Sequence, residues 1–381
     1  FYECRSIKTI NFSSSIISIG SYSFSGCIGL TSYVFEPCII NIGPFSFSRC
    51  SNLEYVEFPS NVKFINESAF ALCTKLETVN ITAVKYIEFG AFYMCYSINE
   101  LHIPSTTSVI GYSAFQHCGM ISELTLEFGI YYIDPYAFDN CSSIPYVDYP
   151  ESITYIDHHS FARCSSLEWI NISKNIEVIY PYAFEYCSRL PELFIPYHIN
   201  VICEGAFRHC TNLTNVTLSE GLTYIEGSVF YNCHSLPEII IPSTVRLVGT
   251  YAFYNNTNLT RCILTHGVTT IDDYAFGQCI SLPDIIIPST VNWRGWHVFD
   301  SCINLTNVTL QNGLSQVNLG AFYNCTALPN ITIPSGVKRI HNYTFTYCDN
   351  LTLVQLPNTI ETTGEKAFAY TVSLPSITIP S

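Results

Sequence analysis

The stretch Ala275–Pro288 reads AFGQCISLPDIIIP, and the same skeleton returns along the whole chain. Its phenylalanine, Phe276, has counterparts 23 residues away on both sides, at Phe253 and Phe299. A short unit that repeats at a fixed interval cannot bury its apolar face alone, but stacked copies bury a continuous core. The stretch therefore predicts a solenoid built from turns of 23 residues.

The phenylalanine column extends over the 381-residue chain. It has 17 members between Phe1 and Phe368, and every step is 23 residues except the 22-residue step from Phe70 to Phe92. The missing residue falls in the turn 81–84, where a deletion disturbs a fold least. We expect about 17 turns in a single domain, residues 1–381. Both ends of the chain fall within a repeat, so we also expect a fragment of a longer protein, uncapped at both ends.

The spacing of apolar residues within one repeat predicts its local structure. In the repeat that begins at Phe230, Ile239 and Ile241 alternate with other residues, which is typical of a short strand with one buried face. Phe230, Cys233 and Leu236 lie three apart, which suits a short helix or 3₁₀ turn that faces the same core. Stacked repeats would then form a parallel ladder of strands, spaced by roughly 4.8 Å.

A second, longer period overlies the first. The position seven residues after the phenylalanine is proline every 46 residues, from Pro145 to Pro375. Threonine takes this position in the intervening turns of the later part of the chain, for example at Thr260. The later turns therefore form a two-turn unit that is repeated several times.

The segment Leu236–Phe253, LPEIIIPSTVRLVGTYAF, resembles the BspA-like (Treponema pallidum-type) subclass of leucine-rich repeats. The resemblance covers all 381 residues. It implies a curved, right-handed solenoid, α/β or mostly β. Its parallel sheet would lie on the concave face, with short helical or 3₁₀ turns on the convex side.

The same resemblance implies a surface-associated protein that functions in adhesion or interaction. Such repeats are known from oral bacteria, spirochaetes and the protozoan parasites Trichomonas and Entamoeba. The family implies binding to host proteins, to matrix or to other microbes, and it names no catalytic residue. We therefore expect a cell-surface or extracellular protein-binding module, a surface antigen in type. The alternative is an intracellular leucine-rich-repeat scaffold or regulator without catalytic activity.

Composition and charge exclude several other functions. The chain carries 16 Lys and Arg against 30 Asp and Glu, a net charge of −14, which disfavours nucleic acids and anionic membranes as partners. No run of about 18 apolar residues is present, so we expect no direct membrane insertion by this segment. The chain has no CxxC, HExxH, GxSxG or glycine-rich phosphate motif. We predict no enzyme, no metal site and no cofactor.

Cysteine stands three residues after the phenylalanine in 15 of the 17 turns, with Asn256 and Thr371 as the exceptions. Because this position faces the core once per turn, we predict a column of free buried thiols rather than disulfides. Disulfides remain the alternative, since they are common in secreted proteins. Cys38, Cys203 and Cys262 lie outside the column and are the candidates for reactive thiols.

Outward positions of the strands, eight and ten residues after the phenylalanine, are the candidate partner-binding residues. Aromatic side chains among acidic ones suit a protein-binding surface, and an exposed row of isoleucines suits a contact site. The alternative is the ordinary preference of such side chains for a solvated sheet. The candidates on the concave face are Tyr55, Glu57, Glu100, His102, Glu123, Tyr146, Asp148, Trp169, Phe194, Ile240, Ile263 and Ile286.

One turn departs from the repeat. Arg294 stands where other turns place isoleucine or valine, and Trp293 and Trp296 lie on either side of it. Either Trp293 enters the core and Arg294 turns outward, or this is a specialised binding turn. We favour the exchange of Trp293 for Arg294.

Overall fold

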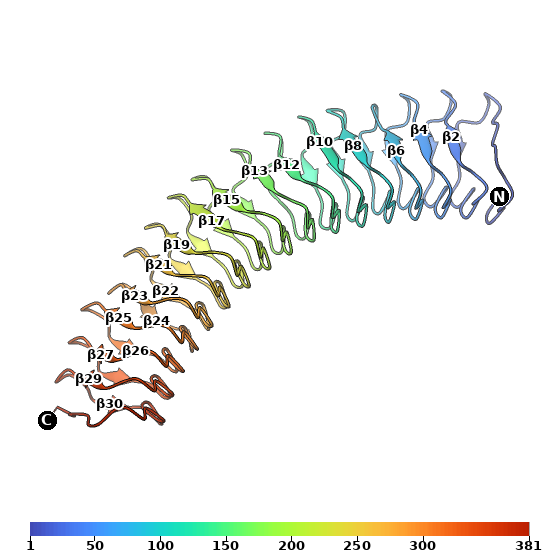
Figure 1. Ribbon diagram of the computed structural model, residues 1–381. Helices are drawn as coiled ribbons and strands as arrows, with labels where there is room; N and C mark the ends of the chain where they lie inside the picture. The colour runs from blue at the N-terminus through green and yellow to red at the C-terminus, as the bar shows by residue number, and fades with distance from the viewer. Residues whose placement is uncertain (381) are drawn as a thin grey trace. The chain divides into compact units, whose positions relative to one another are not determined.

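The computed structural model describes residues 1–380. It contains two compact units, Phe1–Leu190 and Pro191–Ser381. Within each unit, successive turns of the chain stack with their strands side by side, as Figure 1 shows. This confirms the predicted leucine-rich-repeat solenoid. The single domain expected over residues 1–381 stays a prediction.

A regular turn holds one long strand and one short strand. In unit 1 the long strands are β2 (Ser32–Val34), β4 (Tyr55–Glu57), β6 (Thr78–Asn80), β8 (Glu100–Ile103), β10 (Glu123–Leu126), β12 (Tyr146–Asp148) and β13 (Trp169–Asn171). The short strands are β1 (Ser18–Ile19), β3 (Asn41–Ile42), β5 (Phe64–Ile65), β7 (Tyr86–Ile87), β9 (Val109–Ile110), β11 (Tyr132–Ile133) and β14 (Val178–Ile179).

Unit 2 has the same construction. Its long strands are β15 (Glu192–Ile195), β17 (Asn215–Leu218), β19 (Glu238–Ile241), β21 (Arg261–Leu264), β23 (Asp284–Ile287), β25 (Asn307–Leu310), β27 (Asn330–Thr332) and β29 (Leu353–Gln355). Its short strands are β16 (Val201–Ile202), β18 (Tyr224–Ile225), β20 (Leu247–Val248), β22 (Thr270–Ile271), β24 (Asn292–Trp293), β26 (Gln316–Val317), β28 (Arg339–Ile340) and β30 (Thr362–Thr363). Among the described residues, the turns that begin at Phe1 and Phe368 have no long strand, so the turns with a long strand are two fewer than the 17 counted from the sequence.

All strand pairs are parallel, and the long strands of unit 2 pair two by two. The period-46 proline explains the interruption. The N–H groups of Thr260 and Arg261 donate to the carbonyl of Pro237 at 2.8 and 3.1 Å, which starts the ladder between β19 and β21. Pro237 has no N–H with which to start the same ladder toward β17. The two-turn unit predicted from the sequence is therefore visible as strand pairs.

The core is a column of phenylalanine rings, one per turn. The rings of Phe253 and Phe276 stack at 5.2 Å with an interplanar angle of 3°, and both residues are fully buried. Each such pair contributes roughly 0.5–1.5 kcal/mol beyond the burial of its apolar surface. The leucine or isoleucine six residues later and the inward strand residues complete the same core.

The cysteine column is a column of free thiols, as predicted. All 18 cysteines are free, and the thiol of Cys279 donates to the carbonyl of Phe253, in the preceding turn, at 3.3 Å. The same bond recurs along the stack, for example from Cys50 to Phe24 at 3.2 Å. Burial raises the pKa of Cys279 to about 12. These thiols therefore stay protonated at neutral pH and link successive turns.

The prediction of a short helix or 3₁₀ turn around the phenylalanine is wrong. Residues 1–380 contain no helix; this segment is a series of β-turns, with hydrogen bonds from Gly277 N to Tyr274 O and from Cys279 N to Phe276 O. Tyr274 and Gln278 have φ values of +53° and +55°, which a helix cannot hold. The alternate N–H groups, of Tyr274, Phe276 and Gln278, donate to carbonyls of the next turn at 2.7–2.9 Å. Stacking of turns thus overrides the local apolar spacing.

The irregular turn confirms the exchange of Trp293 for Arg294. Trp293 is buried and pairs with Ile271, 22 residues away, while Arg294 is exposed. The regular register returns at Gly295, whose N–H donates to the carbonyl of Ile271 at 2.9 Å. Arg294 is therefore an extra residue that bulges outward, and the larger indole fills the core position.

Candidate functional site

The outward side chains of the long strands form one surface in each unit, which we call the strand face. Strand β8 shows why: Glu100 and His102 are exposed, and Leu101 and Ile103 are buried, because successive side chains of a strand point to opposite sides. Parallel pairing in the 23-residue register then places equivalent outward residues of paired strands beside one another. All 12 predicted binding residues are on this face.

The structure leaves nine of the 12 predicted residues well exposed. Tyr55 and Glu57 are half-buried, and the Tyr55 hydroxyl donates to Glu57 Oε2 at 2.7 Å. This hydrogen bond is the main reason that the pKa of Tyr55 is raised. Ile263 is also half-buried, so the isoleucine row is less exposed at its centre than at Ile240 and Ile286.

Two aromatic side chains meet on the strand face of unit 1. Tyr146 on β12 pairs directly with Trp169 on β13, and the two are 41% and 45% exposed. Beside them, the amide of Asn171 donates to Asp148 Oδ1 at 2.8 Å. A large aromatic pair next to a carboxylate supplies both apolar area and hydrogen-bonding groups to a partner.

Isoleucines meet on the strand face of unit 2. Ile240 on β19 pairs with Ile263 on β21, and Ile286 follows on β23 in the next turn. Ile240 and Ile286 are 47% and 52% exposed. Phe194 on β15 is also exposed, but its partner on β17 is Thr217, so it has no aromatic neighbour across that pair.

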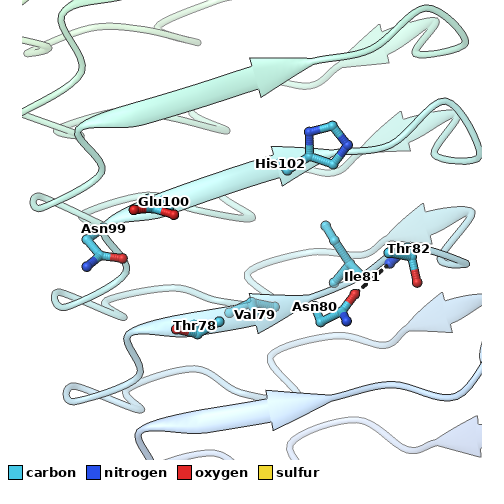
Figure 2. A pocket seen from close by; sticks show the side chains of 8 residues that line it. All are labelled: Thr78, Val79, Asn80, Ile81, Thr82, Asn99, Glu100 and His102. Carbon is cyan, nitrogen blue, oxygen red and sulfur yellow. Dashed lines mark hydrogen bonds between the residues drawn. The ribbon is translucent and has the colours of Figure 1, made fainter.

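The strand face of unit 1 has a hollow between β6 and β8, which we call the β6–β8 fissure. It has a volume of about 410 Å³, and the strands on either side are not paired. Figure 2 shows Glu100 and His102 on one side and Thr78 and Asn80 on the other. The full lining is Thr78, Val79, Asn80, Ile81, Thr82, Asn99, Glu100 and His102.

The fissure coincides with the single 22-residue step of the repeat. Proline explains the other breaks between successive long strands within the units, at Pro145, Pro237, Pro283 and Pro329, but the long strand that follows Asn99 begins without proline. The shortened turn 81–84 lies directly after β6. Sequence reasoning named Glu100 and His102 but missed Asn80, Thr82 and Asn99; the 22-residue step was the signal that could have found them.

His102 is held by the neighbouring turn. Its Nε2 lies 3.0 Å from Glu127 Oε1, and the N–H of Ser105 donates to Glu127 Oε2 at 2.7 Å. The hydrogen bond from Ser105 is the main reason that the pKa of Glu127 is lowered. The carboxylate thus orients the imidazole at the edge of the fissure.

The described residues offer little for metal or membrane chemistry. No group of three or more His, Cys, Asp and Glu side chains within residues 1–380 could hold a metal ion. No helix in the described part of the chain could cross a membrane. Of the cysteines outside the thiol column, Cys262 is buried, whereas Cys38 and Cys203 are half-buried. Burial and the nearby Glu226 raise the pKa of Cys203 to about 12, which makes it a poor nucleophile.

Comparison with known proteins places this geometry in a family. The model of the BspA type leucine-rich repeat region (6 copies) matches residues 1–87, 82–191, 177–302 and 269–381. No match is found among curated proteins.

One solved structure shows the same fold, and two others are similar to this chain. A leucine-rich repeat protein from Bacteroides ovatus is 26% identical, with a TM-score of 0.79 over 90% of this chain and 88% of that chain. The T. pallidum leucine-rich repeat protein is 29% identical, with a TM-score of 0.41 over 49% of this chain and 78% of that chain. A leucine rich cell surface protein from Faecalibacterium prausnitzii is 22% identical, with a TM-score of 0.43 over 89% of this chain and 83% of that chain. Because the family model covers the chain along its length, this protein belongs to the BspA-type leucine-rich-repeat family.

Proposed function

We propose that this chain is an adhesion module that binds host or partner proteins at a cell surface through its strand face. The observation that carries the proposal is the exposure of large apolar side chains on paired strands, Tyr146 with Trp169 and Ile240 with Ile263. These apolar side chains are half-exposed to water, so a partner that covers them stabilises the complex. For an isoleucine such as Ile240, full coverage contributes about 1 kcal/mol.

The net charge of the chain restricts the class of protein that it can bind. With 30 acidic and 16 basic residues, the protein repels polyanions and favours a neutral or basic protein surface. On the strand face of unit 1, Glu100 and Glu123 are opposite each other on β8 and β10, and both are exposed. A basic side chain of the partner would relieve the repulsion between these two carboxylates.

A second function is supported by the free cysteines. Proteins that mature in oxidising compartments usually carry disulfides, and all 18 cysteines of this chain are free. An intracellular scaffold that uses the same strand face fits this observation. Location therefore distinguishes the two functions, because both require the same surface.

Two double variants test the role of the strand face. Tyr146→Ser with Trp169→Ser removes the aromatic pair of unit 1, and Ile240→Ser with Ile263→Ser removes the isoleucine pair of unit 2. Each variant would be immobilised and exposed to a solubilised extracellular-matrix preparation and, separately, to a cytosolic extract. Proteins captured by the wild type and lost with either variant support binding through the strand face.

Matched controls keep the test specific. Tyr132 on β11 and Tyr224 on β18 are exposed aromatic residues of the short strands, outside the strand face. Tyr132→Ser and Tyr224→Ser should leave capture unchanged. Equal capture by the wild type and both double variants would reject the proposal, and capture from the cytosolic extract alone would favour the intracellular scaffold.

A further inference from the structure

The β6–β8 fissure exposes backbone groups that neighbouring turns pair with one another. One turn later, between β8 and β10, the N–H of Glu123 donates to the carbonyl of Asn99 at 3.2 Å. The corresponding bond across the fissure would run from the N–H of Glu100 to the carbonyl of Glu77. Among residues 1–380 no such bond is present, because β6 and β8 are not paired. A donor and an acceptor therefore face each other without a bond between them.

A second donor and a second acceptor are left in the same way. The next bond of the ladder would join the N–H of His102 to the carbonyl of Val79, and it too is missing from the described part of the chain. The side chain of Val79 is buried in the core, so its backbone lines the fissure. Two donors on β8 thus face two acceptors on β6. Because unpaired backbone groups are costly, a ligand that supplies partners for both strands is favoured.

Polar side chains surround these backbone groups. Asn99, Glu100 and Thr78 line the fissure and are exposed. Within residues 1–380 their side chains have no hydrogen-bond partner. Figure 2 shows Asn99 and Glu100 near the beginning of β8 and His102 nearer its end. The lining contains no lysine or arginine, so the fissure offers no positive charge to an anionic ligand.

The width of the fissure excludes a peptide strand as the ligand. The turns on either side of it stay in contact elsewhere: the N–H of Phe70 donates to the carbonyl of Ala91 at 2.9 Å, and β5 pairs with β7. A strand inserted between β6 and β8 would part these turns by roughly 4.8 Å and break both contacts. The fissure therefore admits only groups that enter it from the strand face.

Hydroxyl groups match this arrangement better than charged groups do. A hydroxyl can accept from the N–H of Glu100 and donate to the carbonyl of Glu77 across the fissure. A guanidinium or an ammonium group only donates, and it would leave the two N–H groups of β8 unpaired. A phosphate or a carboxylate only accepts, and the carboxylate of Glu100 would repel it. A saccharide ring is neutral and carries several hydroxyls side by side.

We propose that the β6–β8 fissure binds a neutral hexose unit of a glycan. The ring lies over the fissure on the strand face of unit 1, and adjacent hydroxyls point between the two strands. Glu100 accepts a charge-assisted hydrogen bond from a further hydroxyl, and Asn99 binds beside it. The volume of about 410 Å³ lies within the usual range for small-ligand sites, about 300–1,000 Å³.

This glycan site adds a second ligand class to the strand face. It contains neither the aromatic pair of unit 1 nor the isoleucine pair of unit 2, which carry the proposed protein binding. The variants that test protein binding leave the fissure intact. The two proposals can therefore fail separately.

The test uses the full chain in ligand-observed NMR, with the methyl glycosides of glucose, galactose, mannose and N-acetylglucosamine as probes. The best of these should bind with a dissociation constant on the order of 1 mM. Asn99→Ala combined with Glu100→Ala removes two exposed side chains of the site, so the variant should fold. We expect its binding of the best glycoside to weaken at least tenfold, because a hydrogen bond to a charged group is lost.

Ser122→Ala combined with Glu123→Ala is the matched control. These residues occupy the same two positions in the next turn, where β10 is paired with β8. This variant should bind the glycoside as the wild type does. Equal binding by the Asn99 and Glu100 double variant and the wild type would overturn the proposal, as would the lack of saturable binding of every glycoside.

Two further probes examine the chemistry of recognition. Ethylguanidinium represents the side chain of an arginine, and cyclohexanol is a ring with a single hydroxyl. Both should bind more weakly than the best glycoside. Tighter binding of ethylguanidinium would overturn the proposal and assign the fissure to a basic side chain of a partner protein. Equal or tighter binding of cyclohexanol would overturn it as well, since several adjacent hydroxyls would not then be the basis of recognition.

Discussion

The turns that begin at Phe70 and Phe276 have the same core contacts and differ on the surface. In each, the phenylalanine is fully buried and the next cysteine donates to the carbonyl of the preceding anchor phenylalanine, at 3.2 and 3.3 Å. The long strand of the Phe276 turn, β23, pairs with β25, and the ring of Tyr274 stacks with Tyr251 and with His297. The turn of Phe70 borders the β6–β8 fissure and has Ser68 at the position that Tyr274 occupies beside Phe276. Stacking requires an unchanged core, whereas the surfaces are free to vary between turns.

The largest expected effect comes from the shared core. Phe70→Ala and Phe276→Ala each remove a fully buried ring, and each should lower the free energy of unfolding by about 3–5 kcal/mol. Because the surroundings are alike, the two losses should be similar. Native-state hydrogen exchange would measure the loss in each unit separately. A much smaller loss at Phe70 would show that the shortened repeat loosens the core as well as the surface.

The next effect concerns the turn before Phe276. Asn256 occupies the cysteine position with no exposed surface, and neither its Nδ2 nor its Oδ1 has a partner among the described residues. Asn256→Cys should raise the free energy of unfolding by about 1–3 kcal/mol, because it removes two unsatisfied buried polar atoms. The reverse change, Cys279→Asn, should lower it by a similar amount. An unchanged thermal midpoint for Asn256→Cys would contradict this account of the thiol column.

A smaller effect is expected from restoring the 23-residue step. One residue inserted after Thr82 should let β6 and β8 pair as β4 and β6 do, with a gain of about 0.5–1.5 kcal/mol for each new hydrogen bond. Slower amide exchange at Glu100 would report the new pairing. The same insertion after Ser60 lengthens a regular step and serves as the control. If exchange at Glu100 stays fast, the missing residue is not the cause of the fissure.

The smallest effect concerns the carboxylate at the edge of the fissure. The pKa of Glu127 is lowered, chiefly by the hydrogen bond from Ser105 N–H. Because the folded pKa lies below that of the unfolded chain, the contribution to stability is present above the ordinary value of 4.5 and is lost as pH falls through the folded pKa. NMR titration of the carboxyl group should give the lowered value.

Ser105→Pro removes the donor and should return the pKa of Glu127 toward its ordinary value. Glu220, whose pKa is lowered in the same way by Ser243, provides the control in unit 2 and should not change. An unaltered titration of Glu127 in the variant would show that His102 holds the carboxylate instead.

Much of the candidate site could be predicted because successive side chains of a strand point strictly to opposite faces. Once Ile239 and Ile241 are recognised as inward, Ile240 must point outward, and the 23-residue register places Ile263 beside it. The exchange of Trp293 for Arg294 could be predicted for a similar reason, since a guanidinium is costly in an apolar core. The β6–β8 fissure could not be predicted from the sequence. One missing residue indicates where a turn is shortened, but it does not indicate which hydrogen bonds between strands are lost.

The sequence by itself determined the solenoid, the strand periodicity and the buried columns of phenylalanine and cysteine. These follow from apolar spacing, which acts within each repeat and is the same in all of them. Tertiary structure alone decided that Tyr274 and Gln278 adopt positive φ and that the β6–β8 fissure opens. The physical reason is that both depend on hydrogen bonds between successive turns, which no single repeat contains.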